Sequence, residues 1–249
     1  GLLVAPLVIN SIIAGNTDTP GTSQNDGGGG FDTANSFYNL IGTGGSAGLT
    51  DGTNGNQVGV ADALLGVLAS NGGTTQTHAL LPGSPAINAG NNCVLTNNCA
   101  SNNTGFNLTT DQRGAGFNRQ VGSAMDIGAF ESGGFTLALA PTNSGDNQST
   151  TVNTNFPNPL RVLVTALVAG EPVLNGRVTF TPPGSGASAT IAGTPATLDA
   201  SGLTASGTVT ANGTAGSYTV AATAAGASSG VNFNLTNTAC PVITGTVTG

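Results

Sequence analysis

The chain has 249 residues, enough for one large or two modest domains, and only 6% of them are charged, with a net charge of −7. All four positive charges are arginines, so no basic patch could bind nucleic acid or an anionic membrane surface. The longest apolar runs are too short to insert across a membrane. Glycine, asparagine, threonine and serine make up nearly half of the chain, and they favour strands and tight turns. The composition therefore predicts an all-β extracellular protein.

Two similar motifs open the chain, LVINSIIAGNT at residues 7–17 and FYNLIGTGG at residues 37–45. Each places an asparagine beside a short apolar cluster that is followed by glycine. This pattern is typical of a short strand on a solenoid coil, where apolar side chains point into the stack and glycine permits the bend. Asn10 and Asn39 are expected to occupy equivalent sites, at which their amides can stack in a hydrogen-bonded ladder.

Residues 57–131 carry four motifs in order: DALLGVL, THALLPGSPAINAG, TDQRG and DIGAFE. This stretch resembles the C-terminal end of a large group of bacterial surface and secreted right-handed parallel β-helix proteins. Asn88 stands where those proteins usually have aspartate, and Ala63 and Val67 replace two prolines. The resemblance implies that residues 1–132 form terminal β-helix coils with a capping segment.

Charged side chains gather between TDQRG and DIGAFE, although they are scarce elsewhere. They are Asp111, Arg113, Arg119, Asp126 and Glu131. The planar guanidinium of arginine can bind a carboxylate through two parallel hydrogen bonds. We therefore expect a small ion-pair network that fixes the two motifs against the end of the coil stack, with a clamp for an acidic sugar as the alternative.

The three cysteines form an odd set. Cys93 and Cys99 bracket the loop VLTNN and could close a small disulfide ring, which leaves Cys240 unpaired. An unpaired cysteine in a secreted chain suggests an intermolecular pair, or a chain cut from a longer protein. A zinc site is the weaker interpretation, because His78 is the only other soft ligand and structural zinc usually takes four.

The pattern changes after the capping segment. Residues 133–145 are predicted to be a linker. Residues 146–237 alternate apolar and polar side chains in short runs separated by turn signals, which is typical of a β-sandwich, and they resemble bacterial Ig-like domains of the invasin and intimin type. Tyr218 is interpreted as a corner tyrosine whose hydroxyl bonds nearby backbone, or as a half-buried strand aromatic. Residues 238–249 are predicted to be a further strand or the start of another repeat.

Enzymatic chemistry finds little support in the sequence. A β-helix lyase needs a lysine or arginine base beside its acidic sugar, and the chain has no lysine and no arginine before Arg113. A hydrolase needs two carboxylates a few ångströms apart, and the coil region shows no such pair. Its aspartates are Asp18, Asp26, Asp32, Asp51 and Asp62. The first three are expected to be solvated turn residues, with a loose Ca²⁺ site as the alternative, and His78 is expected to bond the backbone of a tight turn.

These observations favour a non-catalytic protein without a cofactor, outside the cell or on its surface, as a stalk, adhesin or fibre component. Its partners would be a host or matrix surface, or further copies of itself. In a self-assembling form, the C-terminal strand of one copy would add to the open coil end of the next. The residues expected at that contact are Leu2, Val4, Cys240, Val242 and Val247. The alternatives are a glycan-binding module and a β-helix polysaccharide lyase or hydrolase.

Overall fold

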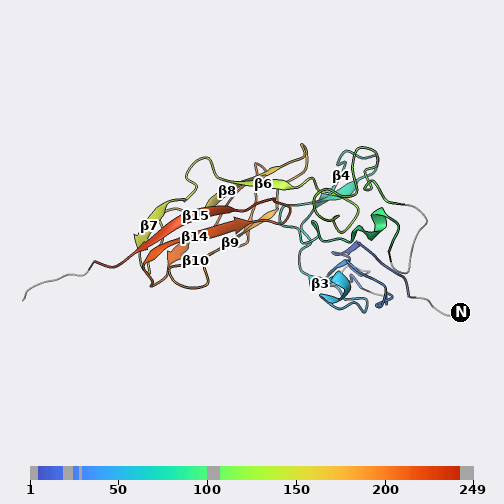
Figure 1. Cartoon of the computed structure of the whole chain (residues 1–249), viewed down its shortest axis with the longest axis horizontal. Coiled ribbons are helices and arrows are strands. Elements are labelled where there is room, and N and C mark those ends of the chain that lie inside the picture. The colour runs from blue at the N-terminus through green and yellow to red at the C-terminus, as the bar shows by residue number, and fades with distance from the viewer. Residues whose placement is uncertain (1–4, 19–24, 28–29, 100–106, 242–249) are drawn as a thin grey trace, which may run out of the picture.

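The computed structural model describes residues 5–18, 25–27, 30–99 and 107–241. Within these residues the chain is all-β, apart from two single 3-10 turns, η1 (Thr53–Gly55) and η2 (Asn92–Leu95). The molecule is elongated, with the sheet that contains β3 at one end and the sheets around β14 and β15 at the other (Figure 1). No helix among the described residues is long and apolar enough to cross a lipid bilayer.

The N-terminal part holds a three-stranded parallel sheet, in the order β1-β2-β3, and an antiparallel hairpin, β4–β5. The strands are β1 (Ile12–Ile13), β2 (Leu40–Gly42), β3 (Gln57–Val60), β4 (Leu65–Ala69) and β5 (Thr77–Leu80). In the parallel sheet Ile12 lies opposite Leu40, and Leu40 lies opposite Gln57. The chain thus passes three times in the same direction, so equivalent residues of successive passes stack in columns.

One column forms the corner that leads into each strand of the parallel sheet. Asn10, Tyr38 and Gly55 occupy it, and all three have positive φ, at 49°, 52° and 69° respectively. Such a left-handed residue reverses the local backbone direction, and asparagine and glycine adopt it most readily. A Cβ on Gly55 would lie 3.0 Å from the Tyr38 ring. The third corner therefore favours glycine both for its φ and for its small size.

The next column is polar, and its two asparagines are buried. Ser11, Asn39 and Asn56 occupy it, and Asn39 Nδ2 donates to Asn56 Oδ1 over 3.0 Å. The Ser11 backbone N–H donates to Asn39 Oδ1, also over 3.0 Å. The predicted amide ladder therefore exists, but the alignment of Asn10 with Asn39 is wrong by one position. The left-handed corner takes Asn10, and Ser11 stands in the ladder.

The C-terminal part consists of three sheets. The largest has the order β11-β9-β14-β15-β7, a second has the order β12-β8-β6, and β10 pairs with β13. All pairs are antiparallel except β7, which runs parallel to β15 at one edge. The strands are β6 (Phe135–Leu139), β7 (Gln148–Thr151), β8 (Arg161–Ala166), β9 (Arg177–Thr181), β10 (Ala189–Ile191), β11 (Ala196–Thr197), β12 (Leu203–Ala205), β13 (Val209–Ala211), β14 (Gly216–Thr223) and β15 (Val231–Thr238).

The segment expected to be a linker, residues 133–145, contains strand β6. β6 pairs with β8 along its whole length, with Phe135 opposite Ala166, and the Phe135 side chain is fully buried. The linker prediction is wrong here because the apolar alternation of β6 is short and follows two glycines. The sheets of the C-terminal part therefore begin before residue 146.

Apolar side chains of both parts belong to one continuous buried cluster. Backbone hydrogen bonds also join the parts, from Arg177 N to the Pro82 carbonyl over 2.7 Å and from Gly83 N to the Ala225 carbonyl over 3.0 Å. The two parts therefore pack directly against each other. Large members of the cluster include Leu40, Leu80, Ile127 and Phe130 from the N-terminal part and Phe135, Val164, Phe180 and Phe233 from the C-terminal part.

Replacing Asn39 with alanine removes the centre of the buried ladder and leaves the Ser11 N–H and the Asn56 amide without that partner. We expect Asn39→Ala to lower the free energy of unfolding by about 2 kcal/mol, because buried polar groups then lose their hydrogen bonds. Urea unfolding followed by circular dichroism measures the change. The control is Asn232→Ala, at an exposed position of β15, which we expect to change the free energy of unfolding by less than about 0.5 kcal/mol. Equal losses in both variants would contradict a ladder role.

Candidate functional site

Six charged side chains form a buried cluster where the N-terminal part meets the C-terminal part. Five of them are the charged residues singled out in the sequence between TDQRG and DIGAFE, and the structure brings all five together. The sixth, Glu171, lies in the loop between β8 and β9. The cluster consists of Asp111, Arg113, Arg119, Asp126, Glu131 and Glu171.

Arg113 is the centre of one half of the cluster. Its Nε and Nη2 donate to Asp111 Oδ2 over 2.9 and 2.7 Å, and Nη2 also donates to the Glu131 carbonyl over 2.5 Å. The guanidinium lies between two aromatic rings, 4.1 Å from the Phe117 centroid and 3.8 Å from the Phe130 centroid. Arginine suits this position because a flat cation can stack on rings while its edge binds a carboxylate.

Arg119 and Glu131 form the other half. Arg119 Nη1 donates to Glu131 Oε2 over 2.9 Å, and Nη2 donates to the carbonyls of Asp126 and Gly128. Glu131 also accepts backbone N–H groups, from Asp126 over 2.9 Å and from Val121 over 2.8 Å. The carboxylate and the guanidinium thus satisfy backbone groups of a segment that has no regular secondary structure.

Glu171 connects this cluster to the C-terminal part. Its carboxylate accepts from Gly133 N over 2.9 Å and from Ser132 Oγ over 3.1 Å, and it lies 3.9 Å from Arg113 Nη1. Asp126 Oδ2 accepts from Ser132 N over 2.7 Å, so Ser132 is held by acids from both parts. Glu171 was not predicted as a cluster member, because the neighbouring Gly170 and Pro172 indicate only a turn. The signal available in the sequence was its rarity, as one of two glutamates.

Burial changes the acidity of three carboxylates in the cluster. It raises the pKa of Asp126 to about 6, and burial together with the negative charge of Asp126 raises the pKa of Glu131 to about 8. Burial also raises the pKa of Glu171.

The cavity beside Arg113 and Glu171 measures about 200 Å³, below the usual range for ligand pockets. The arrangement is therefore suited to holding irregular backbone in place.

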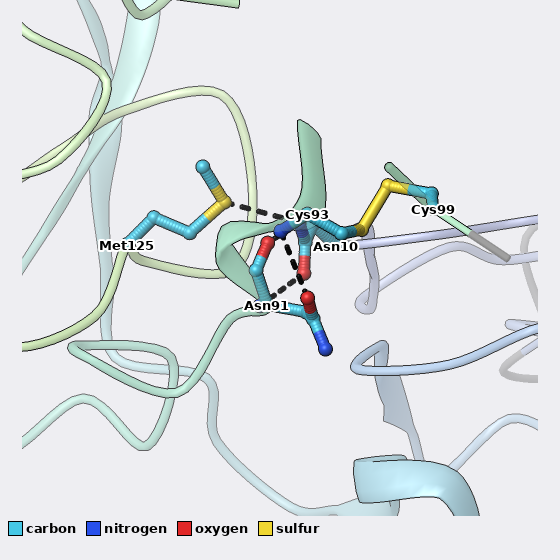
Figure 2. Close-up of a disulfide and its surroundings, with 5 residues drawn as sticks. All are labelled: Asn10, Asn91, Cys93, Cys99 and Met125. Carbon is cyan, nitrogen blue, oxygen red and sulfur yellow. Dashed lines mark hydrogen bonds between the residues drawn. A yellow bond between two sulfur atoms is a disulfide. The ribbon is translucent and has the colours of Figure 1, made fainter. Parts of the chain in front are cut away.

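A disulfide joins Cys93 and Cys99, and the loop that it closes is tied to the entry of β1 (Figure 2). Asn10 Nδ2 donates to the Asn91 carbonyl over 2.9 Å and to Met125 Sδ over 3.1 Å, and Asn91 N donates back to Asn10 Oδ1 over 2.8 Å. Asn91 Oδ1 in turn accepts from Cys93 N. The disulfide loop, the capping segment and β1 thus meet at Asn10.

Asp26 differs from its expected role as a solvated turn residue, because its side chain is buried. It accepts from the Asn16 backbone N–H over 2.8 Å and from Gly44 N over 3.0 Å. Burial alone would raise the pKa of Asp26, but the hydrogen bonds from Asn16 and Gly44 outweigh it and keep the pKa below its usual value. Asp32 does serve a turn, accepting from the backbone of Ala34 and Asn35. In the described part of the chain, no group of three or more His, Cys, Asp or Glu could hold a metal ion.

Other singled-out side chains make local contacts. His78 Nδ1 lies 2.7 Å from the Gly66 carbonyl, so it bonds backbone as expected, but across the β4–β5 hairpin and not within a tight turn. The Tyr218 hydroxyl donates to Asn237 Oδ1 over 3.1 Å, which corrects the corner-tyrosine interpretation, since the acceptor is a side chain. Asp51 accepts from Val58 N over 2.8 Å.

Most of the residues expected at an intermolecular contact lie outside the part of the chain that the structure describes. Leu2, Val4, Val242 and Val247 lie outside the described residues. Cys240 is exposed and forms no disulfide within the described chain.

Asp62 pairs with Arg177 over 2.9 Å across the junction, with both side chains partly exposed.

In comparisons with known proteins, no family model, no curated protein and no solved structure matches this chain.

We expect stability to fall as pH rises from 5.5 to 8.5. Burial raises the folded-state pKa values of Asp126 and Glu131, so protons bind the folded chain more tightly than the unfolded chain. Their contribution is complete below the ordinary carboxyl range and is lost as pH passes about 6 and then about 8. Calorimetry should give a melting temperature about 5 °C lower at pH 8.5 than at pH 5.5.

The matched variants for this pH dependence are Glu131→Gln and Asp199→Asn. Glu131→Gln should flatten the slope because the group with the larger shift no longer titrates, whatever its effect on absolute stability. Hydrogen bonds from Ser201 and Leu203 keep the pKa of the exposed Asp199 below its usual value, so Asp199→Asn should leave the slope between pH 5.5 and 8.5 unchanged. A melting temperature that rises with pH over this range would contradict the assignment.

Arg113→Lys should lower the free energy of unfolding by about 3 kcal/mol. Lysine cannot replace both hydrogen bonds that Nε and Nη2 donate to Asp111 Oδ2, and it cannot stack as a flat cation, so a buried carboxylate loses much of its partner. Arg177→Lys is the control, because the Arg177–Asp62 pair has side chains 42% and 48% exposed and such pairs contribute under about 1 kcal/mol. Denaturant midpoints of both variants measure the difference. Similar losses of unfolding free energy in the two variants would contradict the buried-cluster interpretation.

Proposed function

We propose that this chain is a non-catalytic structural protein of the bacterial cell surface or extracellular matrix, a rigid piece of a stalk, adhesin or fibre. We further propose that its N-terminal part is the end of a right-handed parallel β-helix and that its C-terminal part is an Ig-like sandwich. Self-association, or contact with a host or matrix surface, would complete this role.

The columns of the parallel sheet support the β-helix proposal. Successive passes repeat a left-handed corner, at Asn10, Tyr38 and Gly55, followed by a polar position. At that position Asn39 and Asn56 join their amides. A solenoid coil needs such a repeated corner, because each pass must turn at the same place for the strands to stay in register.

The strand order of the C-terminal part supports the Ig-like proposal. β6, β8 and β12 form one antiparallel sheet, and β9, β14 and β15 form the centre of another, as the A-B-E and C-F-G strands do in that fold. β7, parallel to β15, extends the second sheet. Val162 and Val164 of β8 and Phe233 and Leu235 of β15 belong to one buried cluster, as inner-facing residues of two packed sheets would.

The observation that carries the mechanical role is the junction between the two parts. It is formed by a shared apolar cluster, the buried charges and direct backbone hydrogen bonds. Arg177 N donates to the Pro82 carbonyl over 2.7 Å, and a Cβ on Gly226 would lie 2.9 Å from Ile87 Cδ1. Such close packing transmits force between parts, whereas a polar interdomain linker would yield.

The buried charges also bear on the enzymatic alternatives. Asp126, Glu131 and Glu171 direct their oxygens at backbone N–H groups of their own chain. A polysaccharide hydrolase would need such carboxylates free beside a sugar. The disulfide supports an oxidising location outside the cytosol.

The proposal predicts that the full chain unfolds under force as one unit. Pulled in optical tweezers from residues 5 and 241, it should extend in one cooperative step, because the junction resists separation of the two parts. Glu171→Ala removes the acceptor for Ser132 and Gly133 and should split the event into two steps. Asp62→Ala, which breaks an exposed pair across the same junction, should keep a single step.

Two steps in the unmodified chain would overturn the rigid-spacer proposal. So would specific binding on a glycan array, or cleavage of a pectin-like or alginate-like polymer, since these activities would place the function in a carbohydrate site.

A further inference from the structure

We propose that the outer edge of strand β6 pairs with the same edge of a second copy of this chain, so that two copies join side by side as a twofold-symmetric dimer. This inference rests on the proposed function, whose self-association it assigns to one surface. β6 is an outer strand of the sheet β12-β8-β6. It is left at this edge by the path of the chain, because the next strand, β7, pairs with β15 in the other sheet.

The hydrogen bonds at the two ends of β6 determine which of its backbone groups face β8. The Gly134 carbonyl accepts from Leu167 N over 2.9 Å, and Ala140 N donates to the Arg161 carbonyl over 2.9 Å. The backbone groups of Gly134 and Ala140 therefore point toward β8. Because this direction alternates along an antiparallel strand, the even-numbered residues of β6 face β8 and the odd-numbered residues face outward.

The outward backbone groups belong to Phe135, Leu137 and Leu139. Phe135 N already donates to the Gly226 carbonyl over 2.8 Å. Within the part of the chain that the structure describes, no strand or bridge pairs with the outward side of Leu137 or Leu139. Two N–H and two C=O groups are thus placed to pair with an added strand.

The composition of this edge suits an uncharged partner strand. β6 has five residues, FTLAL, whereas the other outer strands of the two larger C-terminal sheets have two to four. Outer strands are commonly protected by charges or prolines, and β6 contains neither. It is also held in place, since it pairs with β8 along its whole length and Phe135 is fully buried. A preformed edge lowers the ordering cost of binding.

The pattern of free groups is self-complementary, which selects a second copy as the partner. With Ala138 on the twofold axis, Leu137 of each copy lies opposite Leu139 of the other, and each such pair exchanges two hydrogen bonds. A register centred on Leu137 would need Phe135, whose N–H is bonded to Gly226. Ala138 is small and exposed, as suits a non-hydrogen-bonded pair with Cα atoms only about 4.5 Å apart.

This pairing determines the form of the assembly. The sheet would continue through the axis, with three strands from each copy. β6 lies near the middle of the long axis (Figure 1), so the two copies would overlap side by side. A twofold contact uses the same surface on both copies and closes after two. Such a dimer thickens a stalk and does not lengthen it.

Disulfide cross-linking tests the register. The full chain carries Cys240→Ser throughout, so the remaining native cysteines, Cys93 and Cys99, are already joined. Ala138→Cys places two thiols across the axis at a separation that suits a disulfide, and after mild oxidation it should run mainly as a dimer on a non-reducing gel. Thr136→Cys is also exposed but lies about 14 Å from its symmetry mate, so it should stay monomeric.

Sedimentation velocity tests the association without a cross-link. The chain with Cys240→Ser should shift from monomer to dimer as concentration rises, and added salt should strengthen the dimer because each copy has a net charge of −7. Ala138→Lys places like charges opposite each other and should weaken the dimer by about tenfold or more, with an unchanged melting temperature. Thr219→Lys, at an exposed position of β14 in the other sheet, should dimerise normally.

Three outcomes overturn the inference: a chain that stays monomeric at high concentration and high salt, a dimer that Ala138→Lys leaves intact, or equal cross-linking of Ala138→Cys and Thr136→Cys. The force experiment on the rigid-spacer proposal pulls a single isolated chain, so these outcomes leave its result unaffected. Conversely, two unfolding steps under force would overturn the spacer and leave the β6 dimer to be judged by its own cross-link.

Discussion

The structure depends on how the backbone between the hairpin β4–β5 and strand β6 satisfies its hydrogen bonds. In its described residues this stretch lacks a regular ladder, and parts of it are buried at the junction, where unpaired N–H groups are costly. Carboxylates accept these backbone N–H groups. Glu131 accepts hydrogen bonds from the N–H groups of Val121 and Asp126, and Asp126 accepts them from Asn88 and Ser132. A carboxylate offers several lone pairs at one point, so a few acids can organise a long irregular segment.

Buried charges of this kind specify geometry more than they add stability. Exchanging a buried ion pair for apolar side chains is often neutral, whereas removing one partner costs several kcal/mol, on the order of 3–5. The Arg113 guanidinium must lie flat between Phe117 and Phe130 and still meet Asp111 edge-on, which few arrangements satisfy. Glu171 extends the same constraint to the C-terminal part, so the cluster determines how that part docks.

The all-β class, the alternating strands within residues 146–237 and five of the six cluster members could be predicted from the sequence, because alternation and clustered charges are local patterns. Glu171 was missed since its partners lie 38 and 39 residues away along the chain. The asparagine ladder was predicted with the wrong partner because register depends on which residue takes the left-handed corner. Asp26 was misassigned since burial of a loop acid depends on neighbours such as Gly44.

The same contacts define a path for force along the molecule. β14 and β15 run along the long axis and pair over seven residue positions, so tension applied at the end of β15 loads their hydrogen bonds together in shear (Figure 1). The turn that follows β14 passes this load onward, because Ala225 accepts from Gly83 and Gly226 accepts from Phe135. From the junction, the buried charge cluster and the hydrogen bonds of Asn10 to Asn91 and Met125 connect this path to β1. One face of this strand pair is buried, at Val220 and Ala222 of β14 and at Phe233 and Leu235 of β15, so the loaded hydrogen bonds lie beside an apolar core, where a hydrogen bond is electrostatically stronger than in water.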